Sequence, residues 1–232
     1  MTRLWEEGEG YRVADYIRSL ESGHGALCDG IAQEARASHV PVIRPETASF
    51  LKTMTAIVRP ARILEVGAAV GYSALLMAQA MPKGAAITTI ENDGSRAQKA
   101  REHFCTAGME GRITLVEGDA GQVIGKLKGP YDLIFMDAAK GQYIGWLPRI
   151  MELMADGGVL FSDNVFQDGD IFESRFAVER RKRTIHSRMR EYLYVLKHTK
   201  ELETSIVPIG DGVALSVKKA RGIKEAALNE ED

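Results

Sequence analysis

Acidic side chains recur through the middle of this 232-residue chain, and most of them follow a short apolar run. The acids and the amide at these positions are Glu65, Glu91, Asp119, Asp137, Asp163 and Asn164. Carboxylates that meet at one place repel one another, so a shared site would need a positive partner. Their types and spacing therefore predict a site for a cationic organic ligand together with a divalent metal ion.

Asp137, Asp163 and Asn164 are the candidate metal ligands. They offer only carboxylate and amide oxygens, and hard oxygen donors without a thiolate or an imidazole favour Mg²⁺, Mn²⁺ or Ca²⁺ over zinc. Such a set leaves coordination positions open for water or for two oxygens of a substrate. The alternative for Asp163 and Asn164 is an ordinary Asp-Asn turn after a strand. Asp119 also has an alternative, as the cap of a helix.

A glycine turn precedes most of these acids. Residues 62–66 form an apolar run that contains Glu65, then Gly67 and Gly71 interrupt it, and a helical pattern starts at Ser73. A strand that turns on glycines into a helix directs free backbone N–H groups to one point, and glycine lets a ligand come close. The spacing G-x-x-x-G is not the dinucleotide fingerprint, and an adjacent acid suits a cationic ligand or a ribose. The alternative is a tight turn with no ligand.

Two further positions suit the parts of a nucleoside. Glu91 ends the next strand, where an acid about 20 residues beyond the glycine turn can accept hydrogen bonds from ribose hydroxyls. Asp119 and Ala120 could meet the edge of an adenine through a carboxylate and a backbone N–H. Both positions favour a ligand that contains a nucleoside.

The elements that would position these residues alternate along the chain. Strands are expected at 62–66, 87–91, 113–117, 131–136 and 158–162, with helices between them. This alternation indicates a parallel sheet covered on both faces, and the segments 202–207 and 213–217 indicate a hairpin. The sequence thus predicts a doubly wound, Rossmann-like α/β fold. Its mixed sheet has seven strands, mostly parallel, with the C-terminal hairpin at the edge, and ligands bind at the carboxyl ends of the strands.

The organisation of the chain follows from the same pattern. Residues 1–60 are expected to form a helical cover, residues 61–219 the ligand-binding core, and residues 220–232 a charged tail, all in one structural domain. Within the cover, helices are expected at about 10–20, 25–37 and 45–57. The apolar face of the first of them consists of Tyr11, Ala14, Ile17 and Leu20. These helices could cover the sheet or pack on a second copy of the chain.

The composition excludes several classes of protein. The formal net charge of −2 gives no overall attraction to polyanions, so a nucleic acid would have to bind a local basic patch. The 2 cysteines, Cys28 and Cys105, lack metal-ligand spacing and agree with a reducing, cytoplasmic setting. The acidic N-terminus is not a signal peptide, and no apolar run approaches the roughly 18 residues of a membrane helix.

One local basic patch stands out between residues 175 and 200. The candidate nucleic-acid contacts in it are Arg180, Arg181, Arg183 and Arg188. Arginine clusters contact phosphate backbones, and a base turned out of its stack could pack on one of the aromatic rings of Phe176, Tyr192 and Tyr194. The alternative is a solvated helix face. Its inward-facing side chains would be Ile185, Met189, Leu193 and Leu196.

The order and spacing of these motifs resemble the metal-dependent O-methyltransferases, which include the catechol and caffeoyl-CoA enzymes. The resemblance covers roughly residues 35–219, and its motifs are residues 65–73, Glu91, 118–120, 137–140, 163–165 and 208–216. It implies that S-adenosylmethionine is the methyl donor and that Asp137, Asp163 and Asn164 hold Mg²⁺. The residues that it implies for the donor are Val42, Glu65, Gly67, Gly71, Tyr72, Ser73, Glu91, Asp119, Ala120 and Asp137. It implies that Lys140 and Asp137 are catalytic, with Lys140 either stabilising an oxyanion or, if its pKa is lowered, taking a proton.

Within that family, the segments 40–47 and 180–193 look most similar to bacterial tRNA 5-hydroxyuridine methyltransferases, which form 5-methoxyuridine at the wobble position. The resemblance therefore implies a tRNA substrate and a homodimer. Methylation of a small catechol or a caffeoyl-CoA-like thioester is the first alternative, because each also presents two adjacent oxygens. A non-catalytic module that only binds S-adenosylmethionine is the second, and it would leave the metal ligands and Lys140 without a task.

Overall fold

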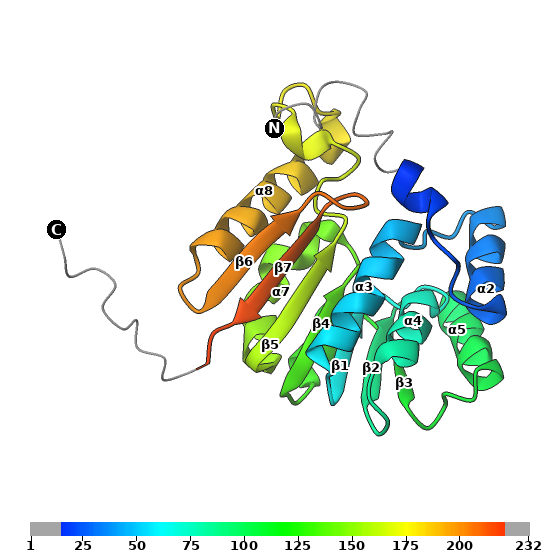
Figure 1. Cartoon of the computed structure of the whole chain (residues 1–232). Coiled ribbons are helices and arrows are strands. Elements are labelled where there is room, and N and C mark those ends of the chain that lie inside the picture. Colours follow the sequence, from blue (N-terminus) through cyan, green and yellow to red (C-terminus); the bar gives the residue numbers. More distant parts are fainter. Residues whose placement is uncertain (1–14, 221–232) are drawn as a thin grey trace.

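A seven-stranded sheet runs through the molecule, and helices pack on both of its faces (Figure 1). The structure is a computed structural model that describes residues 15–220. The strands are β1 Arg62–Val66, β2 Ala86–Glu91, β3 Ile113–Glu117, β4 Tyr131–Met136, β5 Met154–Asp163, β6 Leu202–Val207 and β7 Val213–Lys218. Their order is β3-β2-β1-β4-β5-β7-β6, with β7 antiparallel to both of its neighbours and the other pairs parallel. The expected doubly wound, mixed sheet with a C-terminal hairpin at its edge is confirmed.

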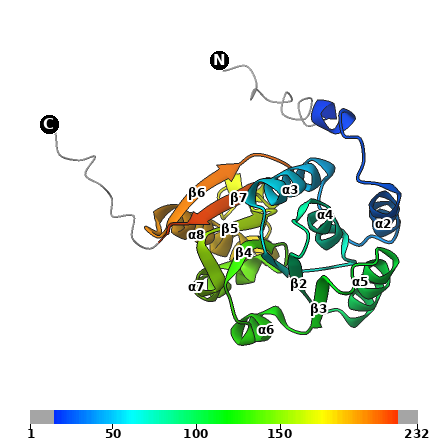
Figure 2. The same ribbon diagram turned by 60° about the horizontal axis from the view of Figure 1, so that its bottom comes forward.

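The helices divide between the two faces of the sheet. They are α2 Ala26–Ala37, α3 Pro45–Val58, α4 Tyr72–Ala80, α5 Gly94–Thr106, α6 Ala120–Lys126, α7 Tyr143–Leu153 and α8 Arg183–His198. Among residues 15–220 there are also three 3₁₀ turns, η2 Lys140–Gln142, η3 Asp170–Phe172 and η4 Arg180–Lys182. In Figure 2, α3 and α4 lie on one side of the strands, and α6 and α7 lie on the other.

Alternation along the strands builds a separate core on each face, because successive side chains of a strand point to opposite sides. Ile63, Phe135 and Phe161 pack with residues of α3 and α4, and the rings of Phe135 and Phe161 lie 5.4 Å apart at an angle of 64°. Leu64 and Leu160 point the other way, toward α7 and α8. Both faces of the central strands are buried, as a parallel sheet requires.

Strand β5 begins at Met154, earlier than the expected 158. The glycines at 157 and 158 resemble a turn in the sequence, but here they form an irregularity inside the strand, where the pairing with β4 shifts between Tyr131 and Leu133. A Cβ at Gly158 would lie only 2.8 Å from Ala155 O and 3.0 Å from Tyr131 O. Glycine therefore marks a close backbone contact at this point and not the end of the strand.

The N-terminal helix is only partly described. Residues 15–19 are helical, whereas Tyr11 and Ala14 of its expected apolar face lie outside the described residues. Ile17 and Leu20 are exposed, so these two side chains do not follow the first expected alternative, a cover of the sheet. Arg18 attaches the helix to α3 through two bonds of 2.9 Å to the carboxylate of Glu46. The charged tail from 221 to 232 also lies outside the described residues.

Candidate active site

A cavity of about 750 Å³ opens beyond the carboxyl ends of the parallel strands. Its wall comes from the turns that follow β1, β2, β3 and β4, and from the segment 41–43 between α2 and α3. This is the position at which a doubly wound sheet binds ligands, because the turns at these strand ends leave a crevice between them. The cavity is large enough for a nucleoside-sized ligand.

Most of the residues expected to contact a donor or a substrate lie in this wall. They are Val42, Gly67, Tyr72, Ser73, Glu91, Asp119, Ala120, Asp137, Lys140 and Asn164. They come from segments that are far apart in the sequence, and the sheet brings them to one edge. Glu65, Gly71 and Asp163 are not part of the wall.

Glu65, which was expected to contact a ligand, lies beneath the cavity and does not line it. Its side chain is fully buried in β1, and its two oxygens accept hydrogen bonds from the hydroxyls of Ser73, at 2.5 Å, and of Thr89. Burial raises the pKa of Glu65 to about 7. Glu65 therefore holds Ser73, which does line the cavity, at the start of α4.

The two glycines of the turn have different roles. Gly67 has φ 103°, and a Cβ there would lie 2.1 Å from Asp137 O, so only glycine allows β1 and β4 to end side by side. Gly71 has φ 84°, and a Cβ there would lie 2.6 Å from Cε1 of Phe104 on α5. Glycine at this position thus permits close packing of the turn against α5.

Glu91 connects β2 to the glycine turn. Its carboxylate accepts backbone hydrogen bonds from Ala69 at 2.7 Å and from Asn92 and Asp93 at 3.0 Å each. The residue is 6% exposed and lines the cavity, so the carboxylate is fixed before any ligand arrives. Asp119 caps α6 through Gln122 N at 3.0 Å and also lines the cavity, so the cap does not exclude a contact with a ligand.

Lys140, Asp137 and Asp163 meet at the end of the cavity near β4 and β5. Lys140 Nζ lies 2.6 Å from Asp137 Oδ1 and 3.2 Å from the backbone oxygen of Asp163. It also lies 3.1 Å from the hydroxyl of Tyr143, which in turn donates to Met136 O at 2.9 Å. The amine of Lys140 is therefore surrounded by oxygen atoms.

The surroundings of Lys140 determine its protonation state. Burial acts to lower its pKa, but the oxygens of Tyr143, Asp137 and Asp163 outweigh burial and raise the pKa above the ordinary value. A lysine held as an ammonium suits the stabilisation of an oxyanion. The other expected role, a base, would need a lowered pKa, and the charges of Asp137 and Asp163 act against that here.

Asp163 has the buried, unpaired oxygen that a metal site would need. It ends β5 and is 5% exposed, and its Oδ1 is buried with no hydrogen-bond partner among the described residues. Burial, followed by the negative charge of Asp137, raises its pKa to about 7. Asn164 follows with φ 58° and lines the cavity. These oxygens fit a hard divalent cation.

That fit depends on the amide of Asn164. Within residues 15–220, no group of three or more His, Cys, Asp or Glu side chains could hold a metal ion. The candidate ligands Asp137, Asp163 and Asn164 are two carboxylates and one amide. They are therefore not a group of that kind, and the third ligand would be the amide oxygen of Asn164.

The wall also contains residues that were not expected from the sequence, among them Arg96, Gln142 and Trp146. Arg96 lies in the first turn of α5, shortly after Glu91 ends β2, so its place in the chain could have indicated it. Trp146 and Gln142 carry no such signal, because α7 and the turn before it reach the cavity only through the packing of the fold.

Only some arginines of the basic segment before and within α8 are free to contact another molecule. Arg180 and Arg181 are exposed, and Arg181 pairs with Glu179 at 2.7 Å. Arg183 donates to Phe176 O and Val178 O at 3.1 Å each, so it also holds its own loop. Arg188 donates to Gly141 O at 3.0 Å, directly beside Lys140. The basic segment therefore touches the rim of the cavity.

Two expectations for this segment are wrong. Tyr192 is fully buried, and its hydroxyl lies 2.6 Å from Ser162 Oγ, so its ring cannot stack on a base. Ile185 is 40% exposed and is not packed inward, whereas Met189 and Leu196 are buried as expected. Phe176 is 85% exposed, and Tyr194 stacks on His198 with ring centroids 3.9 Å apart.

The sheet order and a cavity at its strand ends define a Rossmann-like methyltransferase fold. The SAH-bound methyltransferase PaMTH1 from Podospora anserina has the same fold, with a TM-score of 0.81 and 25% identity over 93% of this chain and 97% of that chain. The sequence model of the O-methyltransferase family matches residues 29–219, and the chain belongs to this family.

Relatives with assigned activities agree with this family. Catechol O-methyltransferase from Niastella koreensis is 30% identical over 56% of this chain, and the match spans 61% of that enzyme. Caffeoyl-CoA O-methyltransferase 2 from Populus trichocarpa is 30% identical over 72% of this chain and 70% of that enzyme. No helix within residues 15–220 is long and apolar enough to pass through a membrane.

Proposed function

We propose that this protein is an S-adenosylmethionine-dependent and divalent-metal-dependent O-methyltransferase whose substrate presents two adjacent oxygens. The observation that carries the proposal is the cluster at the end of the cavity near β4 and β5. There, Lys140 Nζ contacts Asp137. The buried Oδ1 of Asp163 has no hydrogen-bond partner within residues 15–220, and the next residue, Asn164, lines the cavity.

The donor would bind along the turns after β1, β2 and β3. Glu91 is fixed by three backbone N–H groups and would accept hydrogen bonds from the ribose hydroxyls. Asp119 and Ala120 would meet the adenine edge, and Val42 and Tyr72 would close the wall on the other side. The SAH in the related Podospora structure supports this ligand.

The metal would be held by Asp137, Asp163 and Asn164. When bound, Mg²⁺ would lower the pKa of a substrate hydroxyl and fix its direction, and S-adenosylmethionine would supply the methyl group. Lys140, as an ammonium, would stabilise the negative charge on the reacting oxygen. The remaining wall residues would hold donor and acceptor in line, which is mainly an effect of position.

For the substrate, we propose 5-hydroxyuridine at the wobble position of tRNA, which would become 5-methoxyuridine. Its 4-carbonyl and 5-hydroxyl are adjacent oxygens. Two observations support an RNA substrate. The basic segment reaches the cavity rim through the bond from Arg188 to Gly141. Arg180, Arg181 and Phe176 of the same segment are exposed.

The exposed side chains of Ile17, Leu20 and Ile57 support a further proposal, that two copies of the chain associate.

The second candidate is a small phenolic substrate with two adjacent hydroxyls. It is favoured by the names of relatives that act on catechol and on caffeoyl-CoA. It requires the same donor, metal ligands and lysine, but it gives the exposed arginines no role.

Mass spectrometry of tRNA nucleosides, from cells with and without this protein, tests the substrate. We expect 5-methoxyuridine only where the protein is present, with 5-hydroxyuridine accumulating in its absence. In a parallel assay, the purified protein receives donor and Mg²⁺ with either free catechol or tRNA that contains 5-hydroxyuridine, with and without a chelator. Product from catechol alone would favour the second candidate. Donor binding without product from either substrate would favour the non-catalytic module.

A further inference from the structure

One face of α8 supports the short turn that carries Lys140. Ile185 and Arg188 lie three residues apart, so they project from the same side of the helix. Arg188 Nη1 donates to Gly141 O at 3.0 Å. A Cβ at Gly141 would lie 3.7 Å from Ile185 Cγ1 and 3.9 Å from Arg188 Nη1, so both side chains reach this turn.

The support continues along the helix. Tyr192 lies one turn beyond Arg188, and its ring packs edge-on against Tyr143 with centroids 5.4 Å apart. The hydroxyl of Tyr143 lies 3.1 Å from Lys140 Nζ. Helix α8 therefore contacts the segment from Lys140 to Tyr143 at two points, one through Arg188 and one through Tyr192.

The turn itself is short. It is the 3₁₀ turn η2, which contains only Lys140–Gln142 and is closed by the bond from Gln142 N to Ala139 O at 2.9 Å. It leads directly into α7 at Tyr143, so Arg188 adds a tertiary contact at the start of a longer helical stretch. Lys140 and Gln142 both line the cavity, and Gly141 between them presents its carbonyl to α8.

We propose that Arg188 is a positioning residue for methyl transfer. Its bond to Gly141 O fixes η2 and so keeps Lys140 Nζ beside Asp137 and Asp163. The role in catalysis rests on the proposed function, because the place of Lys140 matters to the rate only if methyl transfer occurs there. The same helix begins in the basic segment, so the surface proposed for RNA and the position of Lys140 share one rigid element.

The reactivity of Lys140 toward an amine-acylating reagent tests the contact without requiring activity. Labelling of individual lysines is followed by peptide mass spectrometry, with exposed Lys128 as the internal reference. We expect Arg188→Ala to raise the labelling rate of Lys140 by about three- to tenfold, the effect of one lost hydrogen bond, and Arg188→Lys to raise it less. Lys197→Ala is the matched control, because Lys197 on the same helix donates to Thr204 O at 2.7 Å, away from η2.

Kinetics then test the consequence for catalysis. With tRNA or catechol, whichever the wild type methylates, Arg188→Ala should lower kcat by a similar factor and leave KM for the donor unchanged. Unchanged labelling of Lys140 would overturn the proposal. So would an unchanged kcat with only a higher KM for tRNA, which would make Arg188 a phosphate contact. If the wild type methylates neither substrate, the proposed function fails, while the labelling still decides whether Arg188 positions Lys140.

Discussion

Lys140 Nζ lies 2.6 Å from Asp137 Oδ1, so the candidate catalytic amine contacts a candidate metal ligand directly. This contact and its neighbours raise the pKa of Lys140 despite burial. A charged amine at this position fits the stabilisation of an oxyanion.

A substitution that keeps the charge of Lys140 should keep part of the activity. Arginine cannot act as a base at neutral pH, but it can stabilise an oxyanion. We expect Lys140→Met to lower kcat by about 10²- to 10³-fold and Lys140→Arg to lower it less, measured at saturating donor. Equal losses in both variants, with both folded by circular dichroism, would contradict the oxyanion role.

Removal of the Asp163 carboxylate should separate metal dependence from folding. Asp163 Oδ1 is buried without a partner among the described residues, so Asp163→Ala removes a group that contributes little to the metal-free fold. We expect the variant to bind the donor, to keep its circular dichroism spectrum and to lose methyl transfer at every Mg²⁺ concentration. Full activity of the wild type in excess chelator would refute the metal role.

Glu91→Ala should weaken donor binding by about 1–3 kcal/mol, because donor hydroxyls and backbone N–H groups lose their acceptor. Calorimetry with S-adenosylhomocysteine measures the change. Glu117→Ala is the matched control: Glu117 ends the neighbouring strand β3, but its carboxylate pairs with Arg101 at the surface. Equal affinities of the Glu91 variant and the wild type would count against the ribose contact.

The buried Glu65 should make the stability of the ligand-free protein depend on pH. Its folded-state pKa is raised to about 7 from an ordinary value of 4.5, so its contribution to stability is present below pH 4.5 and is lost as the pH rises toward 7. The loss should be on the order of 3 kcal/mol. Urea unfolding at pH 5 and pH 8 measures it. In Glu65→Gln this part of the pH dependence should be absent, and identical profiles for the two proteins would rule the assignment out.

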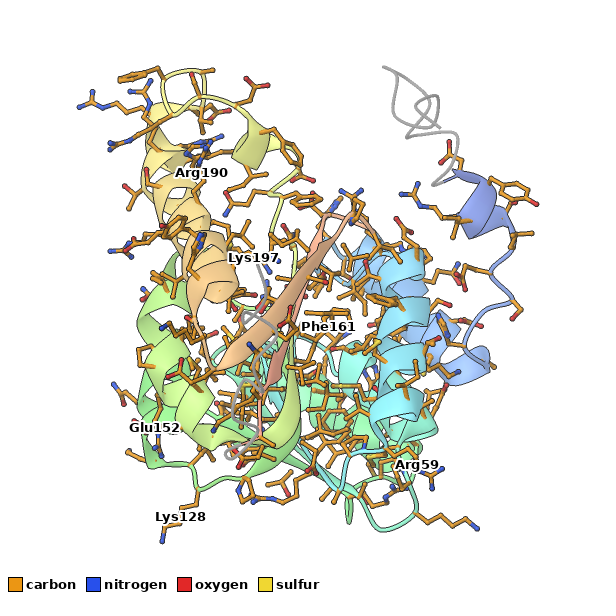
Figure 3. All side chains as sticks on the ribbon, turned by 60° about the vertical axis from the view of Figure 1, so that its left-hand side comes forward. Arg59, Lys128, Glu152, Phe161, Arg190 and Lys197 are labelled. Carbon is orange, nitrogen blue, oxygen red and sulfur yellow. The ribbon has the colours of Figure 1, made fainter. Side chains whose placement is uncertain are left out.

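Substitution of Arg180 and Arg181 tests the RNA surface with the least damage to the fold. Arg183 donates to the backbone of its own loop, whereas Arg180 and Arg181 do not. The double variant Arg180→Ala/Arg181→Ala should bind tRNA more weakly, with a slope of log Kd against log salt reduced by about 2. Binding of the free donor should be unchanged. Lys128→Ala is the control, since Figure 3 shows Lys128 at the opposite end of the molecule from Arg190 of α8. Unaltered tRNA affinity in the double variant would refute the RNA surface.

The sequence alone determined the sheet, because short apolar strands that alternate with helices can be buried only in a covered parallel sheet. It also indicated Glu91, Asp119, Asp137, Lys140 and Asn164, since each of them stands directly at or just after a strand end, and the topology brings those ends to one edge.

Only the tertiary structure decided which way each side chain points and what it meets. Glu65 follows the same pattern as Glu91, yet its partner in the sheet register is Thr89, two residues before Glu91. Its side chain therefore lies below the edge of the sheet, where it meets Ser73 and Thr89. Tyr192 resembled a surface aromatic among arginines, but the turn of α8 places it against Ser162 and Tyr143. The link from Arg188 to Gly141 joins residues 47 positions apart, and such a contact exists only after the chain has folded, because no local pattern encodes which carbonyl an arginine will reach.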